Sequence, residues 1–158
     1  MQKRHQYQSK LAWTGNQGNG TLNYKAYERS YAINFAGKPV LEGSSDPAFR
    51  GDPSKYNPEE MLVASLSSCH MLWYLHLCSV AGIIVEEYED EAKGVMVELE
   101  DGSGKFEEVT LHISVVIQQQ HNMQKAEQLH EEANRMCFIA NSCNFPVKHQ
   151  VEINAIHA

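Results

Sequence analysis

The sequence predicts an α+β fold whose elements follow the order β-β-β-α-β-β-α-β. Three observations carry this prediction. An Asn-Pro-Glu-Glu helix start at Asn57 opens a long apolar segment, two strand-like runs are joined by a glycine turn, and a second helical segment precedes a final strand. The apolar segment contains SSCHMLWYLHLC, from Ser67 to Cys78, which places two cysteines and two histidines in a helix that needs neither for packing.

Length and composition limit the classes of protein to consider. At 158 residues the chain is long enough for one domain with a real core, and we expect a single domain over residues 1–158. A net charge of −7 without a basic cluster argues against nucleic acid and acidic membrane surfaces as partners. The first residues are polar and lack a signal-peptide core, so we expect a cytoplasmic protein. Four cysteines in such a compartment are more often free, redox-active or metal-bound than disulfide-bonded.

The first third of the chain reads as short strands separated by glycine turns. The expected strands have the aromatic and branched content of sheets and cover Gln8–Trp13, Gly20–Lys25 and Tyr31–Phe35. The segment Leu41–Tyr56 is rich in Gly, Pro, Ser and Asp, which predicts a long loop of the kind that often serves a function.

The first helix has clear start and stop signals. Asn57 is expected to cap it, Pro58 suits its first position, and Glu60 completes a variant of the capping box. The helix should run to about Ala81, with Gly82 as the residue that ends it. It is apolar on nearly every face, so we expect a partner subunit to cover it. Its serines, cysteines and histidines argue against a membrane span.

The rest of the chain predicts a hairpin, a helix and a strand. Two long strands, Ile84–Leu99 and Phe106–Gln119, flank the turn sequence EDGSGK. A second helix is expected from Asn122 to about Ile139, and a last strand covers Val147–Ile156. His121 and His130 look exposed on that helix.

Helical geometry limits what could activate Cys69. His70 points about 100° away around the helix, and His76 lies roughly 10 Å along its axis, so neither is placed to take the thiol proton. A positive partner must come from elsewhere in the fold, and arginine stays charged when buried. Cys78 lies nearly opposite in helical phase and cannot pair with Cys69 in one unbroken helix.

Cys137 and Cys143 are then the remaining thiol partners. A thiol in one helix and a second near the end of another suit a peroxidatic and a resolving cysteine. The alternative is that all four cysteines only pack in the core. A zinc site built from His70, His76, Cys69 and Cys143 is also conceivable, but the paired spacing typical of such sites is missing. No cofactor fingerprint is present.

A resemblance favours the redox interpretation. The run Asn57-Pro58-Glu59-Glu60-Met61-Leu62, followed by Ser67-Ser68-Cys69-His70-Met71, resembles the signature of the OsmC/Ohr family, the osmotically inducible protein C and organic hydroperoxide resistance proteins. The segment ANRMCFI, Ala133 to Ile139, resembles the family's second cysteine region. The similarity extends from about Trp13 to Ile156. It implies the OsmC-like fold, with a long buried central helix and an intertwined homodimer whose active sites lie at the interface.

The resemblance also implies roles for individual residues. Cys69 matches the peroxidatic cysteine, Cys137 the resolving cysteine, and Glu59 the glutamate of the active-site network. The family's catalytic arginine precedes the Asn-Pro-Glu motif. Arg50, seven residues before Asn57, is the natural match and Arg29 the fallback.

Two features qualify the match. Glu59 and Cys69 lie ten residues apart, or about 15 Å along a straight helix, so we expect Arg50 or Glu59 to reach a Cys69 across the dimer, or the helix to break near Ser65. Cys137 is followed by Phe138-Ile139-Ala140 where commoner members have Pro, which indicates a less characterised branch. We prefer Cys137 over Cys143 as the resolving residue because it keeps the helix-end position.

The expected function is thiol-dependent reduction of organic hydroperoxides, with an external dithiol as reductant and no metal or organic cofactor. Trp73 and Leu72 read as core residues that could also line an apolar substrate pocket. One alternative is a non-catalytic dimer of the same fold that binds a small molecule or an acyl chain. The other is a hydrolase or transferase with a histidine base, which the phase of His70 and His76 disfavours.

Overall fold

A computed structural model describes residues 2–157 of the chain, with the side chain of His157 not included. The chain divides into two compact units, with the boundary between Met61 and Leu62. Helix α1 (Pro58–Val80) runs through this boundary without a break. The expectation of one domain over residues 1–158 stays a prediction.

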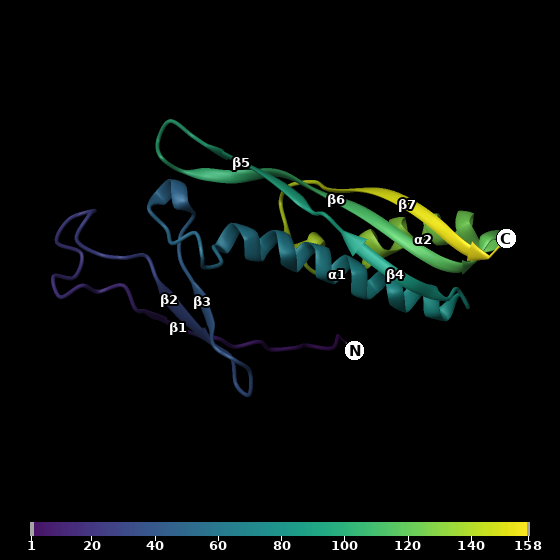
Figure 1. Ribbon diagram of the computed structural model, residues 1–158, viewed down its shortest axis with the longest axis horizontal. Coiled ribbons are helices and arrows are strands. Elements are labelled where there is room, and N and C mark those ends of the chain that lie inside the picture. Colours follow the sequence, from purple (N-terminus) through teal and green to yellow (C-terminus); the bar gives the residue numbers. More distant parts are fainter. Residues whose placement is uncertain (1, 158) are drawn as a thin grey trace. The chain divides into compact units, whose positions relative to one another are not determined.

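The first unit is built on a three-stranded antiparallel sheet in the order β1-β2-β3, drawn in purple to blue in Figure 1. Its strands are β1 (Lys10–Trp13), β2 (Tyr31–Asn34) and β3 (Leu41–Gly43), and a short 3-10 helix η1 (Pro47–Phe49) follows. β3 lies at the start of the segment that the sequence predicts as loop, so that prediction is wrong for its first three residues. The pairing of Leu41 with Ile33 and of Gly43 with Tyr31 holds it in the sheet.

The strand expected over Gly20–Lys25 is a series of turns and bends instead. The side-chain carbonyl of Asn16 accepts the backbone N–H groups of Gly18 and Gly20, and the side chain of Asn23 accepts that of Lys25. Asparagine side chains compete with a strand ladder for backbone donors in this way. The turn chemistry therefore overrides the aromatic and branched content of the segment.

The second unit is a four-stranded sheet with two helices. Its elements are the rest of α1, β4 (Val85–Asp90), β5 (Lys93–Glu98), β6 (Gly104–Gln119), the 3-10 helix η2 (Gln120–Asn122), α2 (Met123–Met136), the 3-10 helix η3 (Ala140–Ser142) and β7 (Val147–His157). β4 and β5 pair antiparallel with the two halves of β6, and β7 runs parallel to β6. The strand expected over Ile84–Leu99 is thus two strands, interrupted at Glu91 and Ala92.

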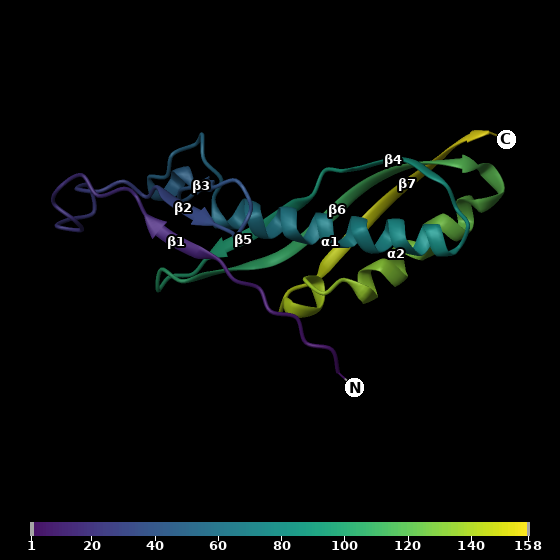
Figure 2. The same ribbon diagram turned by 90° about the horizontal axis from the view of Figure 1, so that it is seen from below.

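The core of this unit lies between one face of the sheet and the two helices. Alternate residues of β6 point into it: Val109, Leu111, Ile113, Val115 and Ile117 are all buried. One face of α1 and one face of α2 cover them, and Figures 1 and 2 show both helices on the same side of the sheet. The face of α1 that is fully buried consists of Leu66, His70, Tyr74 and Cys78, at the four-residue spacing of a helix.

The ends of α1 match the sequence prediction. The Asn57 side-chain oxygen accepts the N–H of Glu60 at 2.8 Å, and the Glu60 carboxylate accepts the N–H of Asn57 at 3.1 Å, which is a reciprocal capping box. At the other end Gly82 has a positive φ of 73°, and Ile83 donates to the carbonyl of Cys78 at 2.9 Å. This left-handed closure suits glycine because it has no Cβ.

α1 also has the length and hydropathy of a membrane span, with a mean hydropathy of 1.3 over an 18-residue window. Core helices of soluble proteins meet the same criterion. Only 22% of that window is buried within this single chain, and the side chains of Leu72 and Val80 are 63% and 73% exposed. Exposed apolar surface of this kind is typical of sites that contact another molecule.

Candidate functional site

The two cysteines singled out by the sequence come together in the second unit. Cys69 lies on α1 and Cys137 is the residue that caps the C-terminus of α2, and both are free thiols. Burial, followed by direct interaction with the Cys69 thiol, raises the pKa of Cys137 to about 11. Two reduced thiols that are 68 residues apart in sequence therefore lie next to one another.

The environment of Cys137 keeps its thiol protonated. Its side chain is buried, and its sulfur accepts the N–H of Ala140 at 3.4 Å. A raised pKa keeps this thiol protonated at neutral pH, and a protonated thiol is a poor nucleophile. Between the two, Cys69 is the half-buried one and the more accessible to a small reagent.

The remaining cysteines occupy other environments. Cys78 is buried in the core, and burial raises its pKa. Cys143 follows η3, donates to the carbonyl of Ile139 at 3.3 Å, and has a pKa raised by burial. The thiol that interacts with Cys137 is Cys69, not Cys78 or Cys143.

Apolar side chains lie close to the two cysteines in sequence, on α1 and just after the end of α2. Trp73 lies one turn after Cys69 on α1, and its ring meets that of Phe138 edge to face at 5.5 Å between centroids. Phe138 directly follows Cys137 and is 66% exposed. A cavity of about 290 Å³ is lined by Leu72, Trp73 and His76. The thiols therefore lie beside an accessible aromatic and aliphatic surface.

The first unit holds the other residues that the sequence analysis singled out. A cavity of about 370 Å³ is lined by both Arg29 and Glu59, together with Trp13, Thr21, Tyr27, Tyr31, Ser44, Ser45, Asp46, Phe49 and Pro58. One carboxylate oxygen of Glu59 and the hydroxyl of Tyr31 are buried without a hydrogen-bond partner among the described residues. Burial, followed by the charge of Glu59, raises the pKa of Tyr31. An unpaired carboxylate at a cavity wall is available to a cation or a donor.

Arg29 is fixed in this cavity by its neighbours. Its guanidinium donates to the carbonyls of Tyr27 and Tyr24, each at 2.6 Å, and lies 4.3 Å from the centroids of both tyrosine rings. Stacking and paired hydrogen bonds hold the charge in one position, as arginine favours. Arg29 was the fallback of the sequence analysis.

Arg50, the sequence's first choice, lies elsewhere. It caps η1 in the left-handed conformation, with φ 66°, and does not line the cavity that contains Glu59. Its side chain is exposed, and its guanidinium lies 5.9 Å from the Tyr24 ring. Sequence distance from the Asn-Pro-Glu motif could not separate the two arginines, since β2 and β3 bring Arg29 back toward the start of α1 within this unit.

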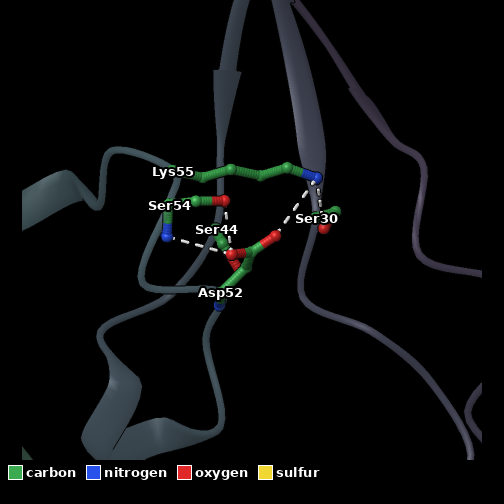
Figure 3. Close-up of polar contacts among 5 residues, drawn as sticks. All are labelled: Ser30, Ser44, Asp52, Ser54 and Lys55. Atoms are coloured by element: carbon green, nitrogen blue, oxygen red, sulfur yellow. Dashed lines mark hydrogen bonds and ion pairs between the residues drawn. The ribbon is translucent and has the colours of Figure 1, made fainter.

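A polar network holds the segment that leads into α1 (Figure 3). The Asp52 carboxylate accepts the backbone N–H and the hydroxyl of Ser54, and its own N–H donates to the Ser44 hydroxyl at 3.0 Å. Lys55 reaches from this segment to the Ser30 hydroxyl at 2.9 Å, while its ammonium stays 3.8 Å from Asp52. Ser44 lines the cavity and Ser30 follows Arg29, so the network fixes the backbone on both sides of the Arg29–Glu59 cavity.

A buried histidine pair was missed by the sequence analysis. His130, expected to be exposed on the second helix, is fully buried, and its Nδ1 lies 3.0 Å from the Nε2 of His70. The buried residues of α2 are Ala126, Leu129, His130 and Ala133. That spacing is the inner face of a helix, and it could have shown that His130 points inward. Among residues 2–157, no three His, Cys, Asp or Glu side chains are grouped so as to hold a metal ion.

The helix-break alternative for bringing Glu59 near Cys69 is wrong. α1 is continuous from Pro58 to Val80, including the turn at Ser65. Within one subunit the two residues are therefore about 15 Å apart along the helix axis.

Comparison with known proteins identifies the family. A family model described as OsmC-like protein matches residues 51–152. A search of curated proteins finds no match. Among solved structures, an OsmC-like protein of unknown function from Vibrio cholerae is 28% identical over 94% of this chain and 100% of its own, with a TM-score of 0.84.

Two further structures share the fold at lower identity. An organic hydroperoxide resistance protein from Elizabethkingia anophelis is 19% identical over 97% of this chain and 99% of its own, with a TM-score of 0.68. The organic hydroperoxide resistance protein OhrB of Bacillus subtilis is 21% identical over 94% of this chain and 98% of its own, with a TM-score of 0.61. The family model covers well over half of the chain and the solved structures share its fold, and the chain belongs to the OsmC-like protein family.

Proposed function

We propose that this protein is a thiol peroxidase that reduces organic hydroperoxides to alcohols. The observation that carries the proposal is the direct interaction of two free thiols, Cys69 and Cys137, from two different helices. The names of the Elizabethkingia and Bacillus structures, organic hydroperoxide resistance proteins, agree with this activity.

In the proposed reaction the Cys69 thiolate attacks the distal oxygen of the hydroperoxide. The O–O bond breaks, the alkoxide leaves and takes a proton to become the alcohol, and Cys69 becomes a sulfenic acid. Cys137 then attacks the sulfenic sulfur while its thiol proton passes to the departing hydroxide, so that a disulfide forms and water leaves. An external dithiol reduces this disulfide by exchange and returns both thiols. No metal or organic cofactor takes part.

We assign the activating charge to Arg29 in preference to Arg50. Arg29 shares its cavity with Glu59, and its guanidinium is held between two tyrosine rings. Because Glu59 cannot reach the Cys69 of its own helix, we propose that the working site is completed in a homodimer. One subunit supplies Arg29 and Glu59, and the other supplies Cys69 and Cys137. The exposed apolar residues of α1, including Leu72 and Val80, support such an assembly.

The apolar surface beside the thiols favours organic hydroperoxides over hydrogen peroxide. Leu72, Trp73 and Phe138 can cover an alkyl or aryl group, and each buried methylene contributes about 0.8 kcal/mol to binding. Hydrogen peroxide has no group to place there.

Turnover tests this proposal. With dithiothreitol as the dithiol, the protein should consume cumene hydroperoxide and release one cumyl alcohol per peroxide, and Cys69→Ser should abolish the reaction. Cys78→Ser serves as the matched control on the same helix. If the native protein consumes no peroxide while its thiols are reduced and it is folded, the alternative of a non-catalytic binding protein takes its place.

A further inference from the structure

The buried imidazoles of His70 and His130 join the same two helices as the thiols do. His70 follows Cys69 on α1, and His130 lies two turns before Cys137 on α2. The two rings are within 9° of parallel, with their centroids 5.3 Å apart and a 3.0 Å contact between Nε2 of His70 and Nδ1 of His130. α1 and α2 are therefore linked at two points, one of imidazoles and one of thiols.

Neighbouring rings restrict the pair further. Tyr74, one turn after His70, stacks on His130 at 3.8 Å between centroids. The ring centroid of His149, on β7, lies 5.5 Å from that of His70 and 6.1 Å from that of His130. The Nε2 atom of His149 lies 3.2 Å from the Glu131 carboxylate. Three elements thus enclose the contact, and neither helix can slide along the other without breaking it.

The chemistry of the pair makes the contact specific. Burial, and the neighbouring histidines after it, lower the pKa of His70 to about 4 and that of His130 to about 3, so both rings are neutral near pH 7. A neutral imidazole pair holds one N–H donor against one nitrogen acceptor. If one ring is replaced by an alkyl group, the other keeps a buried polar atom without a partner, which weakens the packing of the two helices.

We propose that His70 and His130 are positioning residues for disulfide closure: their contact sets the α1–α2 register that keeps Cys137 within reach of Cys69. The inference rests on the proposed function only for the oxidant. With an organic hydroperoxide, Cys69 sulfenic acid and Cys137 thiol yield the disulfide and water. With glutathione disulfide, two exchange steps yield the same disulfide and two glutathione thiols, so closure can be measured without any peroxidase activity.

The choice of substitutions follows from the atoms in contact. His130→Asn places an amide near the Nδ1 position and can keep the contact with His70, whereas His130→Gln places it near Nε2. His130→Leu removes the contact altogether. His121, exposed just before α2, provides the matched control as His121→Asn.

The experiment measures the equilibrium between reduced protein and the Cys69–Cys137 disulfide in glutathione buffers, by thiol trapping and mass spectrometry. His130→Leu should lower the effective concentration of the thiol pair by about tenfold, because an unpaired buried imidazole loosens the helix contact. His130→Asn should recover most of this loss, and His121→Asn should stay within about twofold of the native protein. In a Cys137→Ser background, His130→Leu should leave the rate of sulfenic acid formation at Cys69 unchanged.

Two results would overturn the inference. One is a folded His130→Leu protein that closes the disulfide as readily as the native chain. The other, which applies if the leucine variant does not fold, is equal closure by His130→Asn and His130→Gln.

Failure of the proposed function has a different signature. If the native chain does not react with hydroperoxide, but its disulfide in glutathione buffer depends on His130 as described, the positioning role stands and the peroxidase proposal falls. If peroxide forms the disulfide at the same rate in the native protein and in every His130 variant, the peroxidase proposal stands and the positioning role falls.

Discussion

The Nε2 atom of His70 lies 3.0 Å from the Nδ1 atom of His130 in a fully buried contact between α1 and α2. Each ring also has a second nitrogen, Nδ1 of His70 and Nε2 of His130, that is buried without a partner among the described residues. Burial of this kind favours the neutral form of both imidazole rings over the protonated form. Its first consequence concerns stability in acid.

Folding should weaken as the pH falls from about 6.5 toward 4. Burial lowers the folded-state pKa values of His70 and His130 to about 4 and about 3, below the ordinary imidazole pKa of about 6.5. The unfolded chain therefore binds protons in this range that the folded chain cannot. The free energy of unfolding should fall by up to about 1.4 kcal/mol per pH unit for each of the two histidines. Their contribution is fully present above pH 6.5.

Urea unfolding at pH 7.5, 6.5 and 5.5 measures this loss. The double variant His70→Leu/His130→Leu removes both titrating groups, so its stability should vary less with pH over that interval. His121→Asn should retain the native pH dependence, since His121 is exposed. Parallel curves for the native protein and the double variant would refute the assignment.

Arg29 and Arg50 should differ sharply in their effect on Cys69. Arg29→Met should slow the reaction of Cys69 with cumene hydroperoxide by about a hundredfold, the scale for losing a positioned charge at a reacting group. Arg50→Met should change the rate by no more than about twofold, as for other exposed sites. Stopped-flow kinetics with trapping of the sulfenic acid measures both. The reverse order would return the activating role to Arg50.

The capping box should contribute to the stability of the fold. Asn57→Ala leaves the N–H of Glu60 without its side-chain acceptor and should lower the free energy of unfolding by about 1 kcal/mol. Asn57→Ser keeps an acceptor at the same position and should lose much less. Chemical denaturation compares the two variants. Equal stability of the alanine variant and the native protein would show that the cap adds nothing.

The sequence predicted those parts of the fold that depend on contacts between residues close together in the chain. The ends of α1 were predicted because Asn57, Glu60 and Gly82 determine them through local backbone conformation and contacts with residues close in sequence. β3 was missed because Leu41–Gly43 owes its strand conformation to pairing with β2, which is a long-range contact.

The same reason explains which residues of the candidate site the sequence could indicate. Cys69 and Cys137 could be paired from a family resemblance and their places on helices. Arg29 was named only as the fallback, because its place beside Glu59 depends on how β2 returns to the start of α1. The burial of His130 was missed because it depends on which face of α2 meets the sheet. The spacing of Ala126, His130 and Ala133 did contain that second signal.

Trp73 should govern preference among peroxides. Trp73→Ala removes the ring that meets Phe138 beside the thiols, and should raise the KM for cumene hydroperoxide by about tenfold or more through lost apolar contact. Its kcat/KM for hydrogen peroxide should be nearly unchanged, because that substrate has no group to bury. Steady-state kinetics with both peroxides gives the ratio. A parallel loss for both substrates would indicate damage to the thiols themselves.

Disulfide mapping after a single equivalent of organic hydroperoxide shows directly whether Cys69 and Cys137 react as proposed. Reduced protein is treated with cumene hydroperoxide, alkylated, digested and analysed by mass spectrometry, beside Cys69→Ser and Cys143→Ser. We expect a Cys69–Cys137 disulfide that forms in the native and Cys143→Ser proteins and is absent in Cys69→Ser. A Cys137–Cys143 disulfide with Cys69 still reduced, or no oxidation at all, would contradict it.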